Sequence, residues 1–104
     1  MSRTRVYSAA TMGVMDRFFT ALEICREQRI LKVNKYCDQH GINASHLYLQ
    51  RKERCRGFFE IGWAIPLVRS YGVSSFWLLT GLGTMFAPKG AREYEEQLPS
   101  ASGQ

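Results

Sequence analysis

The segment KVNKYCDQHGINASHLYLQ, residues 32 to 50, predicts two short helices joined by a turn. In its first half, four side chains recur at the helical intervals i, i+3, i+4 and i+7, and these are Val33, Tyr36, Cys37 and His40. Gly41 follows at the position where a residue in the left-handed conformation commonly closes a helix. Asn43 can then cap a second helix from Ala44 to about Lys52, because its side chain accepts a hydrogen bond from an otherwise unpaired backbone N–H.

Further helical patterns flank this pair. Upstream, residues 14 to 29 carry an apolar stripe at helical intervals, which predicts an amphipathic helix of about four turns. Downstream, residues 61 to 71 predict another helix, in which Pro66 fits only the first turn. The stretch SSFWLLT, residues 74 to 80, predicts a last short helix that Gly81 closes. The sequence therefore predicts an all-α fold, a compact bundle of about five short helices without a convincing strand.

The basic residues are concentrated in one segment of the chain. Between Arg26 and Arg56 there are eight cations and three acids, so this segment alone accounts for the net charge of +5 of the whole chain. In the rest of the sequence, cations and acids cancel. A basic excess confined to one segment indicates a surface for a polyanion such as nucleic acid, whereas a solvated cationic face is the simpler alternative.

Length and composition are those of one globular domain. The chain has 104 residues, of which 45% are apolar and 22% charged, enough for a single core. The longest apolar run, residues 58 to 68, includes Glu60 and is far shorter than the roughly 20 residues that a membrane helix needs. The N-terminus lacks the apolar region of a signal peptide, so we expect an intracellular protein with no membrane partner.

No pattern of a metal, cofactor or catalytic site is found in the sequence. The three cysteines cannot all pair with one another, and we expect them to be buried as small apolar side chains. Cys37 and His40 lie three residues apart, but no second close pair of ligands completes a zinc site. The glycines of TGLGT, residues 80 to 84, lack the preceding strand and the following Lys-Ser/Thr of a phosphate-binding loop. We therefore expect a protein that acts by binding and is not an enzyme.

Two segments resemble a known DNA-binding family. KVNKYCDQHGINASHLYLQ resembles the helix-turn-helix of the lambda-repressor-like family, the Cro-like or XRE-type domains. IPLVRSYGVSSFWLLTGLGTMF, residues 65 to 86, resembles the closing helices of phage and mobile-element repressors in that family. The resemblance implies a lambda-repressor-like DNA-binding domain over residues 14 to 86, an N-terminal arm at 1 to 13 and a C-terminal tail at 87 to 104. Because Gln50 stands where the family has an apolar anchor, we expect its helix to end early or to rotate until Leu49 replaces Gln50 inside.

The resemblance also implies which residues face DNA. Base readout is expected at the start of the second helix and one turn later, from Asn43, Ala44, Ser45, His46 and Tyr48. Phosphate contacts are expected on either side, from Lys32, Asn34, Lys35, Arg51, Lys52, Arg54 and Arg56. The alternative for Tyr48 is a partly exposed packing ring, and the alternative for the cations that follow it is a solvated loop. Arg3 and Arg5 of the arm could contact DNA, although a disordered or crystal-packed end is the simpler interpretation.

The implied function is that of a transcriptional regulator that binds double-stranded DNA sequence-specifically in the major groove and represses by occupying an operator. Since one helix-turn-helix covers only a few base pairs, we expect a homodimer. Trp77 is expected in the core, and Phe76, Met85 and Phe86 are expected on the dimer surface. The protein would then be cytoplasmic in a bacterium and associated with the nucleoid when bound to DNA. The alternative is a protein-interaction module on the same fold, such as an antitoxin or a phage accessory protein.

Overall fold

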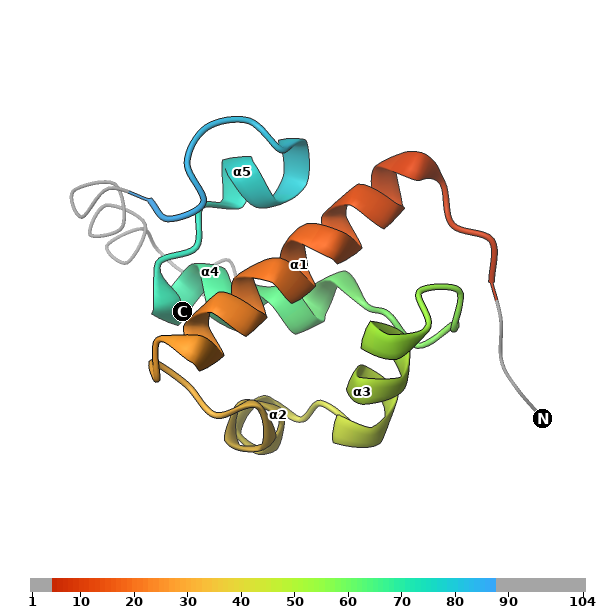
Figure 1. The fold of residues 1–104 in the computed structure, drawn as a ribbon, viewed down its shortest axis with the longest axis horizontal. Helices are drawn as coiled ribbons and strands as arrows, with labels where there is room; N and C mark the ends of the chain where they lie inside the picture. The colour runs from red at the N-terminus through yellow and green to blue at the C-terminus, as the bar shows by residue number, and fades with distance from the viewer. Residues whose placement is uncertain (1–4, 88–104) are drawn as a thin grey trace, which may run out of the picture.

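The computed structural model describes residues 5–87, which form five α-helices and one short 3-10 turn (Figure 1). The elements are α1 (Ala9–Glu27), α2 (Val33–His40), α3 (Ala44–Lys52), η1 (Ile61–Ala64), α4 (Ile65–Tyr71) and α5 (Ser75–Thr80). Over residues 5–87 there is no strand, and Val73 forms an isolated bridge with Phe86. The prediction of an all-α bundle of about five short helices is confirmed.

The ends of α2 and α3 lie where the local chemistry predicts them. Gly41 ends α2 in the left-handed conformation with φ 68°, which a residue without a Cβ adopts at little cost. Asn43 caps α3, because its side-chain oxygen accepts a hydrogen bond from the backbone N–H of His46 at 3.0 Å. Only two residues therefore separate the C-cap of one helix from the first residue of the next, which fixes α3 close behind α2.

The first helix begins earlier than the sequence predicts. α1 starts at Ala9, where Ser8 is its N-cap and accepts from the backbone N–H of Thr11 at 3.1 Å. Residues 5 to 8 lie against the connection that follows α3, with the Tyr7 hydroxyl donating to a backbone carbonyl at 2.7 Å. The arm expected at 1 to 13 is thus helical from residue 9 onward. Residues 1–4 of that arm, with Arg3, and residues 88–104 of the expected tail lie outside the described residues.

Arg17 explains why a glycine stands inside α1. Its Nε donates to the backbone carbonyl of Leu78 at 2.7 Å, which links α1 to the end of α5. A Cβ at Gly13 or at Gly81 would lie 3.1 Å from an Nη atom of Arg17, so both glycines leave room for the guanidinium.

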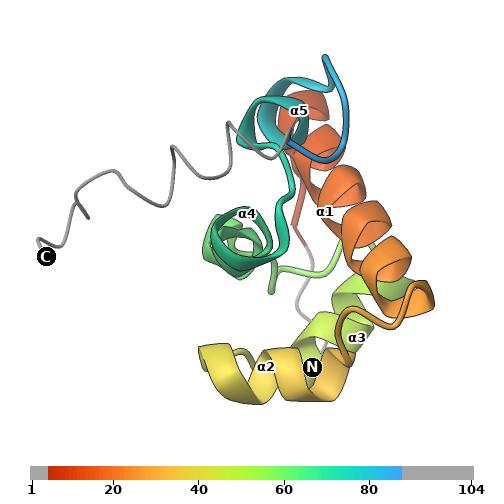
Figure 2. The same cartoon turned by 90° about the vertical axis from the view of Figure 1, so that its left-hand side faces the viewer.

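The core is formed where α1 meets the remaining helices. Figures 1 and 2 show α5 on one side of the bundle and α2 and α3 on the opposite side, with α4 between them and α1 running across all three. Phe18 of α1 lies at the centre, with its ring centroid 6.0 Å from that of Phe59 and 6.3 Å from that of Trp63. Tyr36 is buried beside them, and its hydroxyl donates to the Trp63 carbonyl at 2.6 Å. Desolvation raises the pKa of this phenol far above its usual value, so Tyr36 is a neutral core residue.

Gln50 is the one polar residue of the buried core in the described part of the chain, and its side chain is 0% exposed. Its amide nitrogen donates to the Arg54 carbonyl at 2.9 Å, and its amide oxygen accepts from the backbone N–H groups of Phe58 and Phe59 at 2.9 and 3.1 Å. The expectation that α3 ends early, or rotates until Leu49 takes the inner position, is therefore wrong. A glutamine is accommodated here because the connection after α3 presents backbone groups that need partners.

Replacing the Gln50 amide by an apolar side chain of similar size tests this role. Gln50→Leu is expected to lower the free energy of unfolding by about 2 to 4 kcal/mol, because two buried N–H groups and one carbonyl lose their partner. Urea denaturation followed by tryptophan fluorescence measures the change. Lys52→Ala, at an exposed position of the same helix, is the control and should stay within about 0.5 kcal/mol of the unaltered protein. Equal stability of Gln50→Leu and Lys52→Ala would contradict the role given to the amide.

Candidate nucleic-acid interface

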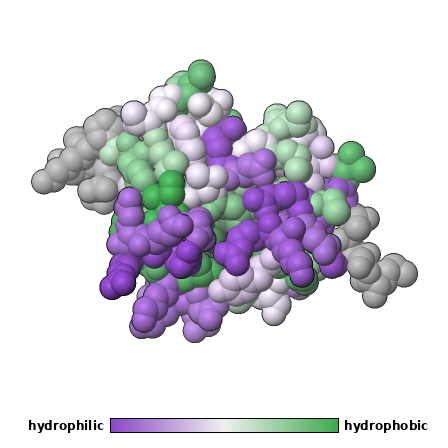
Figure 3. All heavy atoms as spheres, viewed as in Figure 1, coloured by the Kyte–Doolittle hydropathy of each residue, from purple (hydrophilic) through white to green (hydrophobic). Residues whose placement is uncertain are grey.

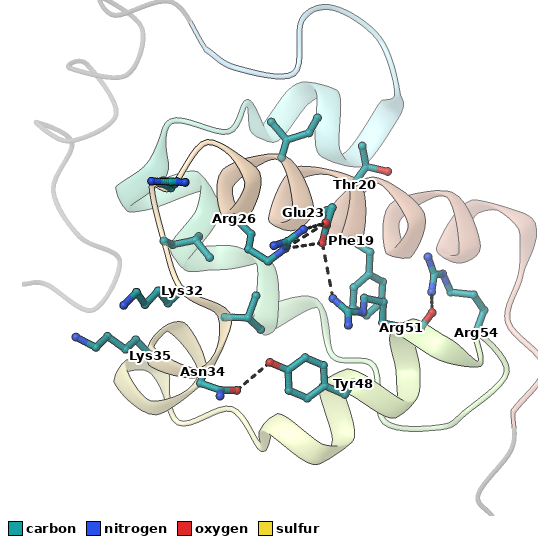
Figure 4. A pocket seen from close by; sticks show the side chains of 14 residues that line it. Phe19, Thr20, Glu23, Arg26, Lys32, Asn34, Lys35, Tyr48, Arg51 and Arg54 are labelled. Carbon is teal, nitrogen blue, oxygen red and sulfur yellow. Dashed lines mark hydrogen bonds and ion pairs between the residues drawn. The ribbon is translucent and has the colours of Figure 1, made fainter.

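A groove of about 1240 Å³ lies between α1, α2 and α3. We call it the basic groove, and Figure 4 shows side chains of the 14 residues that line it. Its cationic lining residues are Arg26, Arg29, Lys32, Lys35, Arg51 and Arg54, and its one acidic lining residue is Glu23. In Figure 3 hydrophilic side chains gather on this face of the molecule, and hydrophobic atoms are visible between them. The charge excess of residues 26 to 56 is therefore concentrated around one concave surface.

The structure divides the residues predicted to contact phosphates into two groups. Five of them line the basic groove, namely Lys32, Asn34, Lys35, Arg51 and Arg54. Lys52 is exposed at the end of α3 and does not line the groove, and Arg56 ion-pairs with Glu53 at 2.8 Å. Arg54 lies at the groove but also pairs with Asp16 at 2.8 Å and covers the Phe19 ring at 4.6 Å. Within residues 5–87, Lys32 and Lys35 form no ion pair, so their charges are free to meet a ligand.

Two further cations of the groove, Arg26 and Arg29, were not predicted as site residues. Arg26 is in the last turn of α1, and Arg29 follows in the turn to α2 with a positive φ of 62°. Both belong to the segment of excess charge, but their place beside α2 depends on the reversal of the chain after α1. Two signals in the sequence could have indicated them, namely their place in the segment of excess charge and their spacing of three residues at the end of the predicted helix.

The residues predicted to read bases differ in how freely they face solvent. Ser45 is exposed at the start of α3, and its hydroxyl makes no hydrogen bond within residues 5–87. The Asn43 side-chain oxygen is occupied as the N-cap of α3, and the His46 ring stacks on Phe58 at 4.0 Å with 10° between the planes. Tyr48 is half-buried, and its hydroxyl donates to the Asn34 side chain at 2.8 Å. Ala44 is also half-buried. The exposed polar surface at the start of α3 thus consists mainly of Ser45 and the outer edge of Asn43.

Three of the exposed large apolar side chains lie on α5 and its exit. Phe76, Leu79 and Leu82 have relative exposures of 59%, 55% and 61%. Met85 and Phe86, which we expected on a dimer surface, are partly buried against the core, because the segment that carries them pairs with residues 72 to 74. Trp77, which we expected in the core, is likewise partly buried against it.

Residues 5–87 hold no group of three or more His, Cys, Asp or Glu side chains that could bind a metal ion. Cys37 and His40, the pair considered for zinc, have different surroundings. His40 packs edge-on against Tyr36 with ring centroids 5.1 Å apart, whereas Cys37 is buried. None of the helices formed by these residues combines the length and the apolar character needed to cross a bilayer.

Comparison with known proteins adds no relative. No protein-family model matches the chain, and no curated protein or solved structure is significantly similar to it. The basic groove and the sequence pattern of α2 and α3 are thus the observations on which a function can be argued.

The expectation that all three cysteines are buried is wrong for Cys55, so the three thiols should differ sharply in reactivity. Burial raises the pKa of the Cys25 and Cys37 thiols, so less thiolate is present at a given pH, whereas Cys55 is exposed on the connection after α3. A chromogenic disulfide reagent at about pH 8 should therefore titrate one thiol in the folded protein and all three in denaturant. Cys55→Ser should leave no fast-reacting thiol. Rapid modification of two or three thiols in the folded protein would contradict the buried positions of Cys25 and Cys37.

Proposed function

We propose that this protein is a transcriptional regulator that binds double-stranded DNA sequence-specifically, with α2 and α3 acting as a helix-turn-helix. The observation that carries the proposal is the basic groove, in which free cations at the start of α2 lie beside the C-terminal half of α3. A polyanion fits such a surface because each neutralised phosphate releases condensed counterions, which favours binding without any requirement for apolar contact.

The two helices would have different tasks on DNA. α3 would enter the major groove with its N-terminal end, where Ser45 can donate to or accept from a base edge. α2 would meet the phosphate backbone through Lys32 and Lys35. Lys32, the N-cap residue of α2, makes no side-chain capping bond, so the backbone N–H groups of the first turn can also donate hydrogen bonds to a phosphate oxygen.

A homodimer completes the proposal. The exposed apolar side chains of Phe76, Leu79 and Leu82 lie on α5 and its exit, whereas the basic groove is formed by α1, α2 and α3. A second copy bound through α5 would leave both grooves open. It would also allow two α3 helices to reach half-sites about 34 Å apart on one face of a duplex. Occupation of an operator in this way would repress transcription by excluding other proteins from the promoter.

The second candidate is a protein-interaction module that holds an acidic amphipathic peptide in the same groove. Apolar residues line the groove, as a site for an amphipathic peptide requires, but most of them expose little surface. Three apolar lining residues, Phe19, Leu31 and Val33, are only 3%, 7% and 6% exposed, so among the apolar aliphatic and phenyl side chains of the groove only the half-buried Ile24 offers more than a small area to a peptide. The charged rim remains available, and this balance favours a nucleic acid over a protein partner.

Removing the two free lysines tests DNA binding by the groove. Lys32→Ala with Lys35→Ala should weaken binding to all duplex sequences and should lower the slope of log affinity against log salt by about 2 units in magnitude, since two phosphate contacts are lost. Fluorescence anisotropy with a labelled duplex of mixed sequence over a range of salt concentrations measures the slope. Arg69→Ala, which removes an exposed cation on α4 away from the groove, is the control and should leave the slope unchanged. A double variant with the slope of the unaltered protein would remove the groove from the proposal.

The dimer is tested on α5. Phe76→Ser with Leu79→Ser should give a folded monomer, because both side chains are more than half exposed and contribute little to the core. Sedimentation velocity should show the unaltered protein as a dimer at concentrations where the variant is monomeric. Ile61→Ser, at another exposed apolar residue on η1, is the control and should remain a dimer. A monomeric unaltered protein that protects one unrepeated half-site would rule out the symmetric arrangement.

A further inference from the structure

An acidic side chain inside the basic groove requires an explanation. Glu23 is the one acid among the residues that line it, and a carboxylate at this position repels the phosphates that the other lining residues attract. Its side chain is 38% exposed, so it is not a buried group that the core requires. Repulsion of a ligand would be a net disadvantage unless the carboxylate also improves the site.

Glu23 joins two arginines from different helices. The Arg26 guanidinium, one turn further along α1, donates from Nε to both carboxylate oxygens at 3.1 Å and also ion-pairs through Nη2. Arg51 approaches from α3, with its Nη1 3.8 Å from Oε1 of the same carboxylate. The hydrogen bond from Arg26 is the main cause of the lowered pKa of Glu23, so the carboxylate is charged at neutral pH. Glu27 also approaches Arg26, at 4.0 Å, but is not paired with Arg51.

The second arginine is held from another side as well. The Arg51 guanidinium lies over the Tyr48 ring, 5.1 Å from its centroid, and the Tyr48 hydroxyl is bonded to Asn34 of α2 at 2.8 Å. Figure 4 shows the two halves of this chain of contacts, from Arg26 through Glu23 to Arg51 and from Tyr48 to Asn34. The contacts therefore cross the groove from α1 through α3 to α2 and place both guanidinium groups in defined positions.

We propose that Glu23 is a positioning residue that holds Arg26 and Arg51 as a pair, so that their remaining N–H donors grip one DNA backbone phosphate in the basic groove. The inference rests on the proposed DNA-binding function and deepens it by naming a phosphate subsite. Each guanidinium has five N–H donors in a fixed fork, and one carboxylate leaves several of them on each arginine for a phosphate.

Glu23 has two opposing effects on DNA affinity, since it orders two arginines but also repels the phosphate, and their relative size decides whether it strengthens binding. Ordering a long side chain on binding weakens affinity by about two- to tenfold, and Glu23 orders two such side chains in advance. Repulsion between the exposed carboxylate and a phosphate is screened by solvent and salt and is worth less than about fivefold. Advance ordering is thus expected to outweigh repulsion, so that loss of a negative charge weakens the binding of a polyanion.

The test compares two variants that each lose one negative charge, measured with a labelled duplex DNA of mixed sequence at constant low salt. Glu23→Gln is expected to bind roughly fivefold more weakly than the unaltered protein, because both arginines lose their common partner. Asp38→Asn is the matched control, since Asp38 is exposed on α2, does not line the groove and forms no ion pair within residues 5–87. It should bind equally well or slightly more tightly. Thermal unfolding should be similar for both variants.

The effect of Glu23→Gln on DNA affinity should change sign when both arginines are absent, and this distinguishes positioning from general electrostatics. In a protein that already carries Arg26→Gln and Arg51→Gln, the further change Glu23→Gln should leave affinity unchanged or raise it, because only the repulsion remains. If Glu23→Gln tightens binding in the unaltered background, as Asp38→Asn does, the positioning role is overturned while DNA binding by the groove still holds. If the unaltered protein shows no salt-dependent binding to the duplex, the proposed function fails and the inference fails with it.

Discussion

The arrangement of the bundle depends on one buried amide. The chain that leaves α3 turns back over the core and carries the backbone N–H groups of Phe58 and Phe59 into partly buried and buried positions, where unpaired donors are costly. Gln50 satisfies both of these groups and also binds the Arg54 carbonyl, so it fixes the connection at both of its ends. This places Phe59 against Phe18, and the rest of the aromatic core is assembled around that contact. An apolar anchor at residue 50 would fill the same space but would leave the connection without its polar partner.

The same connection determines which cations remain free. Arg54 and Arg56 are carried past α1 and past the end of α3, where each finds a carboxylate within 2.8 Å. Lys32 and Lys35 stand on α2, where no acidic side chain among the described residues reaches them. Net charge is therefore a poor guide to the groove. Its capacity to attract an anion depends on the cations that the fold leaves without an internal partner.

The sequence predicts those features that depend on neighbouring residues. Gly41 and Asn43 define the turn between α2 and α3 because their chemistry acts within a few residues, and both predictions are confirmed. The start of α1 was predicted too late, since the apolar stripe begins at residue 14 whereas the helix begins at Ala9 behind the Ser8 cap. The inner position of Gln50 and the contact of Glu23 with Arg51 were missed because both depend on the tertiary fold. Lys32 and Lys35 line the groove and Lys52 does not, whereas the pairing of the arginines depends on tertiary contacts that no local pattern encodes.

How well this surface would discriminate between DNA sequences depends on which of its polar side chains have no partner within the protein. Six cations line the groove beside the start of α2, and phosphate contacts made there would supply affinity but carry no direct sequence information. Of the side chains expected to read bases, Asn43 caps its own helix and Tyr48 is bonded to Asn34, which leaves Ser45 as the free reader. Discrimination by this surface would then be weak unless Tyr48 exchanges its bond to Asn34 for one to a base. Because the Tyr48 ring also lies under Arg51, such an exchange would move the arginine at the same moment, and base readout would be coupled to the grip on the backbone.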